Sequence, residues 1–347
     1  MPVFEDNAIA ALAIHHVGNK AVMEPLVRSN GPTPLGEALS TSLLQYFIEP
    51  FKVREYYHLY HPDGLDHNEV YRLAEALFDD PESLYDVSLQ LAQVLYDACT
   101  HPNIKGGDLF VAYFRECQFE GQAMDAIGLF KAETQSEFLK VNHDADCRFS
   151  LDADRGIDMH KLDKGAIIFH TEDDRGYVVS VVDNAGRGSD AAYWRDQFLG
   201  LLQRQDEFYN THAELAAYKK FITDELPQQF DGVSRADQAD LLGKSVDFFK
   251  QNDRFDLDTF SDEVIRQPEV IESFKQYRQQ YQQDNQVELS DEFAISDEAV
   301  KKQARVMRSV IKLDKNFHIY VHGNRQMIEQ GEDEKGKYYK VYYKEES

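Results

Sequence analysis

The stretch that decides the fold is residues 109–133, LFVAYFRECQFEGQAMDAIGLFKAE. It contains two runs rich in aromatic and aliphatic residues, 109–119 and 123–133, separated by a short turn, which is typical of consecutive β-strands. Residues 137–141 have the same character, so we expect three strands in a meander. Two more strands are predicted over 165–170 and 177–182, whereas the polar stretch 142–163 between them is predicted to be a long loop.

Helices are predicted before this β-rich region. Residues 35–47 form one, and a second begins near Asp66, an N-cap residue with Glu69 three positions later. A third begins at Asp80-Pro81-Glu82, because proline is well tolerated in the first turn of a helix. Periodicity does not decide whether residues 9–17 form a strand or a short helix.

Beyond residue 190 the pattern becomes helical. Thr211 and Glu214 have the spacing of a capping box, which predicts a helix over 213–226. The remaining predicted helices and strands of this half follow in chain order: helices over 235–252, 257–266, 268–284 and 297 to about 308, then strands over 317–322, 326–330 and 337–344. The chain is therefore predicted to be an α+β protein with a mainly antiparallel sheet and helices in its N-terminal half, then a helical segment, then a C-terminal antiparallel β unit. We expect two domains, 1–205 and 206–347.

Composition limits the classes of function. Among 347 residues, 42% are hydrophobic and the formal net charge is −25, which disfavours uniform binding to nucleic acid or to anionic membranes. Three cysteines in no metal-binding spacing indicate reduced thiols. We find no secretory signal and no apolar stretch of about 18 residues, so we expect a cytoplasmic protein with no membrane partner.

The positive charge is concentrated at the C-terminal end. Residues 301–347 contain 11 basic and 7 acidic residues, net +4, whereas every earlier segment is net negative. On a helix, Lys301, Arg305, Arg308 and Lys312 would form one stripe, which could follow a phosphate backbone. The predicted nucleic-acid-binding residues are these four and three neighbouring cations, Lys302, Lys315 and Arg325. Two alternatives remain open: a solvated helix end whose cations complement its dipole, or a strand over 308–313 that would break the stripe.

Motifs for catalysis or metal binding are weak. Residues 186–191, GRGSDA, match a dinucleotide-binding pattern, but no βαβ unit follows. Residues 152–156, DADRG, are similar to a calcium loop but lack its glycine at position six and glutamate at position twelve. The histidines, including His15, His16, His58, His61 and His67, show no ligand spacing. No catalytic residue, metal site or cofactor is predicted.

Several segments resemble the bacterial nucleoid-associated protein family of the YejK/NdpA-like type. They occur in the same order as in that family: IHHVGNK at 14–20, LQYFIEPF at 44–51, DAAYWRDQFL at 190–199, LDKNFHI at 313–319 and GEDEKGKYYK at 331–340. The resemblance implies a cytoplasmic protein that associates with the bacterial chromosome and brings no catalytic residues.

The leading hypothesis is a nucleoid-associated protein that contacts double-stranded DNA, either directly through the C-terminal basic region or through DNA-handling partner proteins. One alternative is an acidic scaffold or DNA mimic that binds proteins only; another is a nucleotide- or metal-dependent enzyme. The sequence leaves open whether the chain forms a homodimer.

Overall fold

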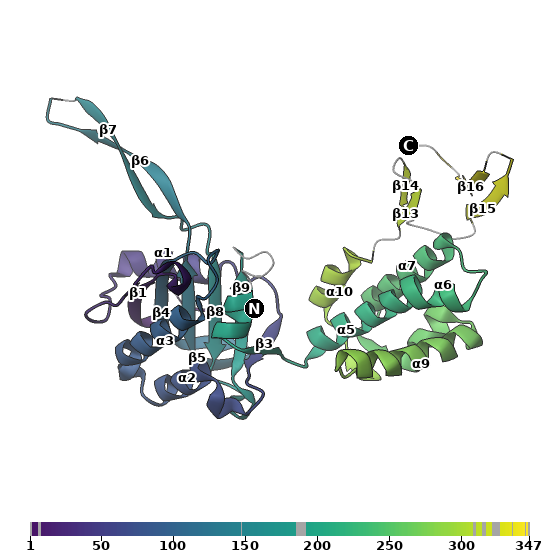
Figure 1. Ribbon diagram of the computed structural model, residues 1–347, viewed down its shortest axis with the longest axis horizontal. Coiled ribbons are helices and arrows are strands. Elements are labelled where there is room, and N and C mark those ends of the chain that lie inside the picture. The colour runs from purple at the N-terminus through teal and green to yellow at the C-terminus, as the bar shows by residue number, and fades with distance from the viewer. Residues whose placement is uncertain are drawn as a thin grey trace. The chain divides into compact units, whose positions relative to one another are not determined.

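A computed structural model gives the structure of the chain, and it describes residues 2–5, 8–146, 148–184, 192–307, 310–313, 317–320, 327–334, 336–343 and 345. The chain divides into two compact units, residues 1–204 and 205–347. The first is built on a large antiparallel sheet and the second is mainly helical (Figure 1). The α+β class is confirmed.

The first unit contains an eight-stranded sheet in which every neighbouring pair is antiparallel. In spatial order its strands are β10 (Leu201–Gln203), β3 (Tyr56–Leu59), β9 (Val178–Asp183), β8 (Lys164–Phe169), β5 (Gln122–Ala132), β4 (Gly107–Phe119), β1 (Ile9–Val17) and β2 (Leu26–Val27). Residues 9–17, undecided from sequence, are therefore a strand.

Both faces of this sheet are buried. Side chains alternate along β4, so Leu109 and Val111 contribute to one hydrophobic cluster while Phe110 and Ala112 contribute to the other. The first cluster is covered by α2 (Glu69–Asp79), α3 (Leu84–Ala98) and the π-helical segment η5 (Tyr193–Phe198), and the second by α1 (Glu37–Ile48). Burial on both faces explains why these strands are continuous apolar runs.

The three strands predicted over 109–141 are confirmed, and the first two pair as predicted. The pairing of the third strand and the loop predicted over 142–163 are wrong. β6 (Gln135–His143) does not continue the sheet but pairs with β7 (Phe149–Ile157), which lies inside the predicted loop. The neighbour of β5 in the sheet is β8. In β7 every second residue is polar and the whole strand is exposed or partly exposed, so its average composition is that of a loop. The two strands form an arm that extends away from the sheet (Figure 1).

The second helix does not begin at Asp66. Residues Leu65–His67 form a separate 3-10 turn, and the N-cap of α2 is Asn68. The side-chain oxygen Oδ1 of Asn68 accepts a hydrogen bond from the backbone N–H of Tyr71, while its side-chain amide nitrogen donates to the backbone carbonyls of Tyr60 and Leu199 at 3.0 and 2.8 Å. Asn68 therefore caps the helix and also joins it to two loops. The smaller turns of this unit are η1 (Lys20–Val22), η3 (Pro81–Ser83) and η4 (Asp173–Arg175).

The second unit is held together by an aromatic core that includes Tyr218, Phe221, Phe260 and Phe274. Its helical elements are α5 (Glu207–Lys220), η6 (Phe221–Glu225), α6 (Leu226–Gln229), α7 (Arg235–Gln251), α8 (Leu257–Phe260), η7 (Ser261–Ile265), α9 (Pro268–Asn285) and α10 (Asp297–Ala304). Its strands form three antiparallel pairs: β11 (Arg254–Asp256) with β12 (Glu292–Ala294), β13 (Val310–Leu313) with β14 (Phe317–Tyr320), and β15 (Ile328–Asp333) with β16 (Gly336–Val341). Ile311 and Ile328 pack with Ala236 of α7, so both C-terminal hairpins belong to the helical unit.

The predicted capping box at Thr211 is wrong. The N-cap of α5 is Asp206, five residues before Thr211, and the Asp206 carboxylate accepts a hydrogen bond from the N–H of Tyr209. Thr211 and Glu214 are both fully buried inside this helix. Thr211 accepts a hydrogen bond from the N–H of Ser296, and Glu214 pairs with Arg278, so both side chains serve tertiary contacts.

Candidate nucleic-acid interface

The predicted basic region begins on α10, a short helix at the surface of the second unit. The helix starts after Ser296, whose hydroxyl accepts from the N–H of Ala299 at 3.4 Å. Ala299 and Val300 are buried, while Lys301 and Lys302 are exposed on the last turn. Arg305, at the C-cap, is exposed as well.

The predicted helix over 297–308 is too long, and the four-cation stripe does not form. α10 ends at Ala304, and residues Val310–Leu313 form β13, paired with β14. The β-branched residues Val310 and Ile311 favour this extended pairing over a continued helix. Lys312 lies in β13 rather than on the helix. Arg308, Lys315 and Arg325 lie outside the described residues.

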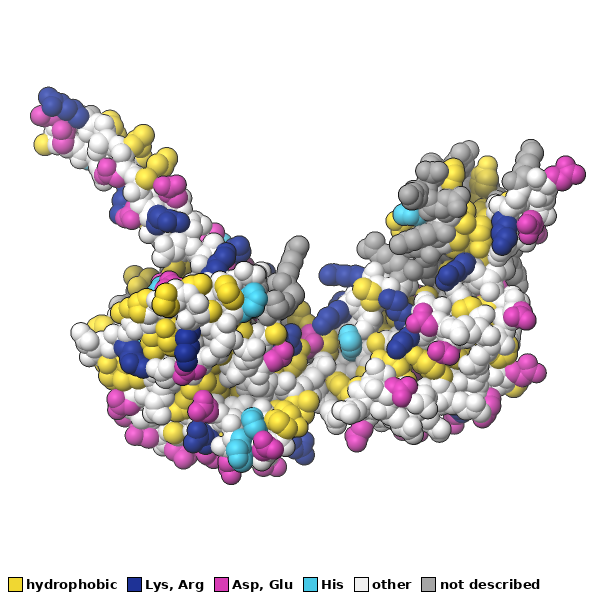
Figure 2. Space-filling view, viewed as in Figure 1, with side chains coloured by type: hydrophobic (Ala, Val, Ile, Leu, Met, Phe, Trp, Pro, Cys, Tyr) yellow, Lys and Arg dark blue, Asp and Glu magenta, His cyan; other side chains and the backbone are white. Residues whose placement is uncertain are grey.

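An aromatic residue adjoins the cations of α10. The ammonium of Lys302 lies 5.3 Å from the centre of the Phe208 ring on α5, close enough for a cation–π contact. The Gln303 amide donates to the carbonyl of His212, one turn along α5, at 3.4 Å. These contacts fix α10 against α5. Figure 2 shows several Lys and Arg side chains on the surface over α10 and near the C-terminal hairpins.

The dipole of α10 also favours this placement of charge. Asp297 and Glu298 occupy its first turn and Lys301 and Lys302 its last, as the partial charges of the helix ends prefer. The cations therefore stabilise the helix whether or not they bind a ligand.

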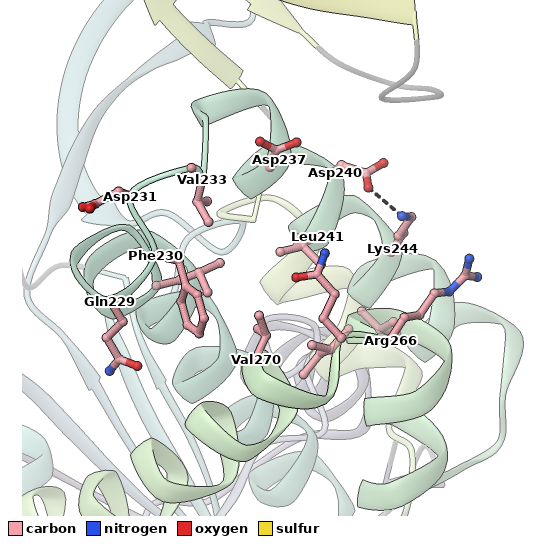
Figure 3. A pocket seen from close by; sticks show the side chains of 15 residues that line it. Gln229, Phe230, Asp231, Val233, Asp237, Asp240, Leu241, Lys244, Arg266 and Val270 are labelled. Atoms are coloured by element: carbon pink, nitrogen blue, oxygen red, sulfur yellow. Dashed lines mark ion pairs between the residues drawn. The ribbon is translucent and has the colours of Figure 1, made fainter.

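A groove of about 740 Å³ opens elsewhere on the second unit, between α6, α7 and the start of α9 (Figure 3). Its apolar surface comes from Phe230, Val264 and Val270, and carboxylates stand at its rim. Of these, Asp240 is paired with Lys244 at 2.6 Å. Asp237 accepts from Ser234 in a capping box that starts α7. The groove is lined by the carboxylates of Asp231, Asp237 and Asp240 and by the cations Lys244 and Arg266, so it carries no excess of positive charge to attract phosphate groups.

One buried histidine lies beside a serine in the first unit. The N–H of Ser29 donates to Nδ1 of His15 at 3.1 Å, so the proton of the neutral ring is on Nε2 and is donated to the Ser88 hydroxyl at 2.8 Å. Ser88 in turn donates to the carbonyl of Tyr85. His15 therefore cannot take a proton from Ser88, and the pair links β1 to α3. Burial, and then the charge of Arg28, lowers the pKa of His15.

Two buried lysines flank Tyr193, a cluster that the sequence reasoning missed. Lys131 donates to Glu133 at 3.1 Å and to the Tyr193 hydroxyl at 3.1 Å, and Lys164 pairs with Asp183 at 2.7 Å. Both ammonium groups also lie about 5 Å from the Tyr193 ring, at 5.2 and 5.0 Å. The sequence signal that could have revealed this cluster is a lysine in each of two apolar strands, Lys131 in β5 and Lys164 at the start of β8. Since each lysine is paired with a carboxylate, the cluster ties strands β5 and β8 to η5.

The weaker motifs have these positions in the structure. Residues 152–156, which are similar to a calcium loop, lie in the strand β7, while residues 186–191 lie outside the described residues. His15 and His16 point to opposite faces of β1, and the His16 ring forms a hydrogen bond with Asp108 at 2.9 Å.

Cys99 and Cys117 are buried thiols, and burial raises the pKa of Cys117 to about 12. Across the described part of the chain, no group of three or more His, Cys, Asp or Glu side chains is placed to hold a metal ion.

Comparison with known families gives the class of the protein, the nucleoid-associated proteins. More particularly, the chain belongs to the family described as nucleoid-associated protein YejK, whose model matches residues 14–336. No curated protein matches the chain. A role at the bacterial nucleoid therefore follows from the family. Within the described ranges, no helix is both long and apolar enough to cross a membrane.

Proposed function

We propose that this nucleoid-associated protein contacts double-stranded DNA directly, through a basic region formed by Lys301, Lys302 and Arg305 together with Arg308, Lys312, Lys315 and Arg325. The observation that carries the proposal is charge segregation: the last 47 residues are net +4 in a chain of net −25. Lys301, Lys302 and Arg305 have exposed side chains on or next to one helical turn. Such a compact group can bind neighbouring phosphates.

The predicted strength of this contact is modest. Each phosphate contact contributes about 0.9 to the slope of log K against log salt concentration, so three contacts give a slope of about −3. The acidic surface elsewhere opposes binding in any other orientation. The contact is thus expected to be independent of DNA sequence and sensitive to salt.

The test is a fluorescence-anisotropy titration of a random duplex at low and near-physiological salt. A Lys301→Glu, Lys302→Glu, Arg305→Glu variant should lose the salt-sensitive binding. The matched control reverses three other exposed cations of the second unit, Lys250, Arg254 and Arg266, with the same change in net charge. Equal losses in both variants would mean that only net charge matters and would refute a localised interface.

A second candidate is favoured by the net charge of −25 itself. An acidic body can dock on the basic surfaces of DNA-handling proteins, as nucleic acid does. If the wild type binds no duplex at either salt concentration, direct contact is refuted and this route remains. A pull-down should then recover the same partners with the wild type and with the triple variant.

A further inference from the structure

The groove on the second unit is lined by apolar side chains that the chain leaves partly uncovered. Phe230, Val233 and Leu241 line it and are only partly buried, although they pack against the core of this unit. We call these three residues the apolar floor. Val264 and Val270, which also line the groove, are 3 and 5% exposed and belong to that core. The groove is therefore an apolar recess open to solvent and backed by a packed core.

The length of the groove follows from α7, which forms one side of it. Asp237, Leu241 and Lys244 all line the groove and lie at positions i, i+4 and i+7, so they share one face of the helix. Seven residues of α-helix rise about 10 Å, so the groove extends over about two helical turns. Its volume of about 740 Å³ is that of a binding pocket. It can accept a row of apolar side chains from a partner.

The walls of the groove decide what kind of backbone can lie in it. The described residues that line it come from helices and from one closed turn, so they present no strand edge. In the turn, the N–H groups of Phe230 and Val233 donate to the carbonyls of Leu226 and Phe230, both at 3.1 Å. An extended peptide would have unpaired N–H and C=O groups over an apolar floor, which costs free energy. A helix pairs these groups internally, so an amphipathic helix is the occupant that fits.

Two charged groups at the rim are available to a partner. Figure 3 shows Asp231 on one side of the apolar floor and Arg266 on the other. Both side chains are exposed, and among the described residues the Asp231 carboxylate has no ion pair or hydrogen bond. Nε of Arg266 donates to the carbonyl of Glu263 at 2.8 Å, which leaves the two Nη groups for a ligand. The groove thus offers an acceptor on one side and a fork of donors on the other.

The other charges of the groove are already compensated. Lys244 pairs with Asp240 one turn earlier on α7 at 2.6 Å. Asp237 accepts from the N–H and the hydroxyl of Ser234 at the start of the same helix. A partner therefore meets one free negative charge and one free positive charge, with apolar surface between them.

We propose that this groove binds an amphipathic helix of a partner protein. The helix carries apolar residues at i, i+4 and i+7, a basic residue beyond one end of this row and an acidic residue beyond the other. Its apolar row spans about 10 Å, the length of the groove along α7, and covers the apolar floor. The basic residue meets Asp231 and the acidic residue meets Arg266. The contact uses no residue of the basic region, so it is a function separate from DNA binding.

The test uses labelled Ala-rich peptides of about 16 residues, long enough to form a helix. All carry leucine at i, i+4 and i+7. The mixed peptide has glutamate one turn before the leucines and lysine one turn after them, and the other two have lysine at both sites or glutamate at both. Fluorescence anisotropy at about 0.15 M salt screens charges more than about 8 Å away, so the order of affinities reports on the groove itself. The wild type should bind the mixed peptide about threefold more tightly than either of the others.

Charge reversals at the rim should change this order. Asp231→Lys should bind the peptide with two glutamates most tightly, and Arg266→Glu the peptide with two lysines. The matched controls Asp253→Lys and Lys250→Glu change net charge equally at exposed positions outside the groove, so the mixed peptide should remain the tightest. Leu241→Glu, which places a carboxylate on the apolar floor, should weaken all three peptides at least about tenfold.

Several outcomes would overturn the proposal. If the peptide with two lysines binds most tightly to the wild type, general attraction to an acidic chain explains the binding. If the three peptides bind equally, the groove accepts apolar groups without selecting charge. Binding that survives replacement of the leucines by alanine, or no binding of any peptide, excludes a helix on the apolar floor. The Lys301→Glu, Lys302→Glu, Arg305→Glu variant should bind the mixed peptide like the wild type, so this proposal and the DNA contact fail separately.

Discussion

Replacing Arg278 by methionine should destabilise the helical unit strongly. Arg278, on α9, is 5% exposed and donates to Glu214 of α5, which is completely buried, at 2.9 Å. It also donates to Asp291 at 2.6 Å and to the carbonyl of Ser290 at 2.8 Å. The second carboxylate oxygen of Glu214 has no hydrogen-bond partner among the described residues. Arg278 therefore supplies the compensation that this buried charge receives.

The magnitude follows from burial. The Asp291 side chain is 74% exposed, so its pair with Arg278 contributes at most about 1 kcal/mol. Removing one partner of a buried pair costs about 3–5 kcal/mol, because the other charge remains without compensation. Removing both charges, in Arg278→Met with Glu214→Gln, should recover most of that loss.

The pH dependence has a definite sign. Burial raises the pKa of Glu214, and Arg278 only partly opposes this. Without Arg278 the folded-state pKa rises further above the unfolded value of about 4.3. The folded variant then binds the proton more tightly than the unfolded chain, so its deficit is largest at neutral pH and shrinks as the pH falls through the folded pKa.

Urea unfolding followed by far-UV circular dichroism reports on the helices of both units, so a transition seen by dichroism but not by the tryptophan of the first unit belongs to the second unit. Fluorescence of Trp194, the single tryptophan, reports on the first unit in the same samples. We expect the urea concentration at the dichroism midpoint to be lower in Arg278→Met than in the wild type and to recover in the double variant. The difference between Arg278→Met and the wild type should be smaller near pH 5 than at pH 7. A single variant as stable as the wild type, or a deficit that does not change with pH, would show that the pair is not a buried ionic contact.

Two further predictions concern the first unit. The pKa of His15 is lowered in the folded chain, so this histidine binds a proton more tightly when the chain is unfolded. The free energy of unfolding should therefore be highest above about pH 6.5 and fall as the pH decreases below that value. The Trp194 unfolding midpoint should drop between pH 7 and about 5.5, and a drop of the same size in His15→Gln would contradict this assignment. Asp163→Ala leaves the partly buried N–H groups of Glu133 and Thr134 without their acceptor and should cost about 2 kcal/mol. Hydrogen exchange at residues 133–136 should accelerate in that variant, and unchanged protection would show that the base of the arm does not depend on Asp163.

Burial explains which strands could be predicted from sequence. β4 and β5 lie between two hydrophobic clusters, so their apolar runs were unambiguous. β7 has one polar and one exposed apolar face, and its composition predicted a loop. β3 and β10 are only four and three residues long, too short for a period of two to show.

Local motifs failed where a tertiary contact used the same residue types. Thr211 and Glu214 have the spacing of a capping box, yet both lie inside α5 because Asp206 caps the helix earlier. The pairing of Glu214 with Arg278 joins residues 64 positions apart, and local sequence carries no sign of it. The cations of the candidate interface were recognisable as a concentration of charge. The sequence did not decide between a helix that continues to residue 308 and a strand over 308–313, and the structure has α10 ending at Ala304 and β13 paired with β14.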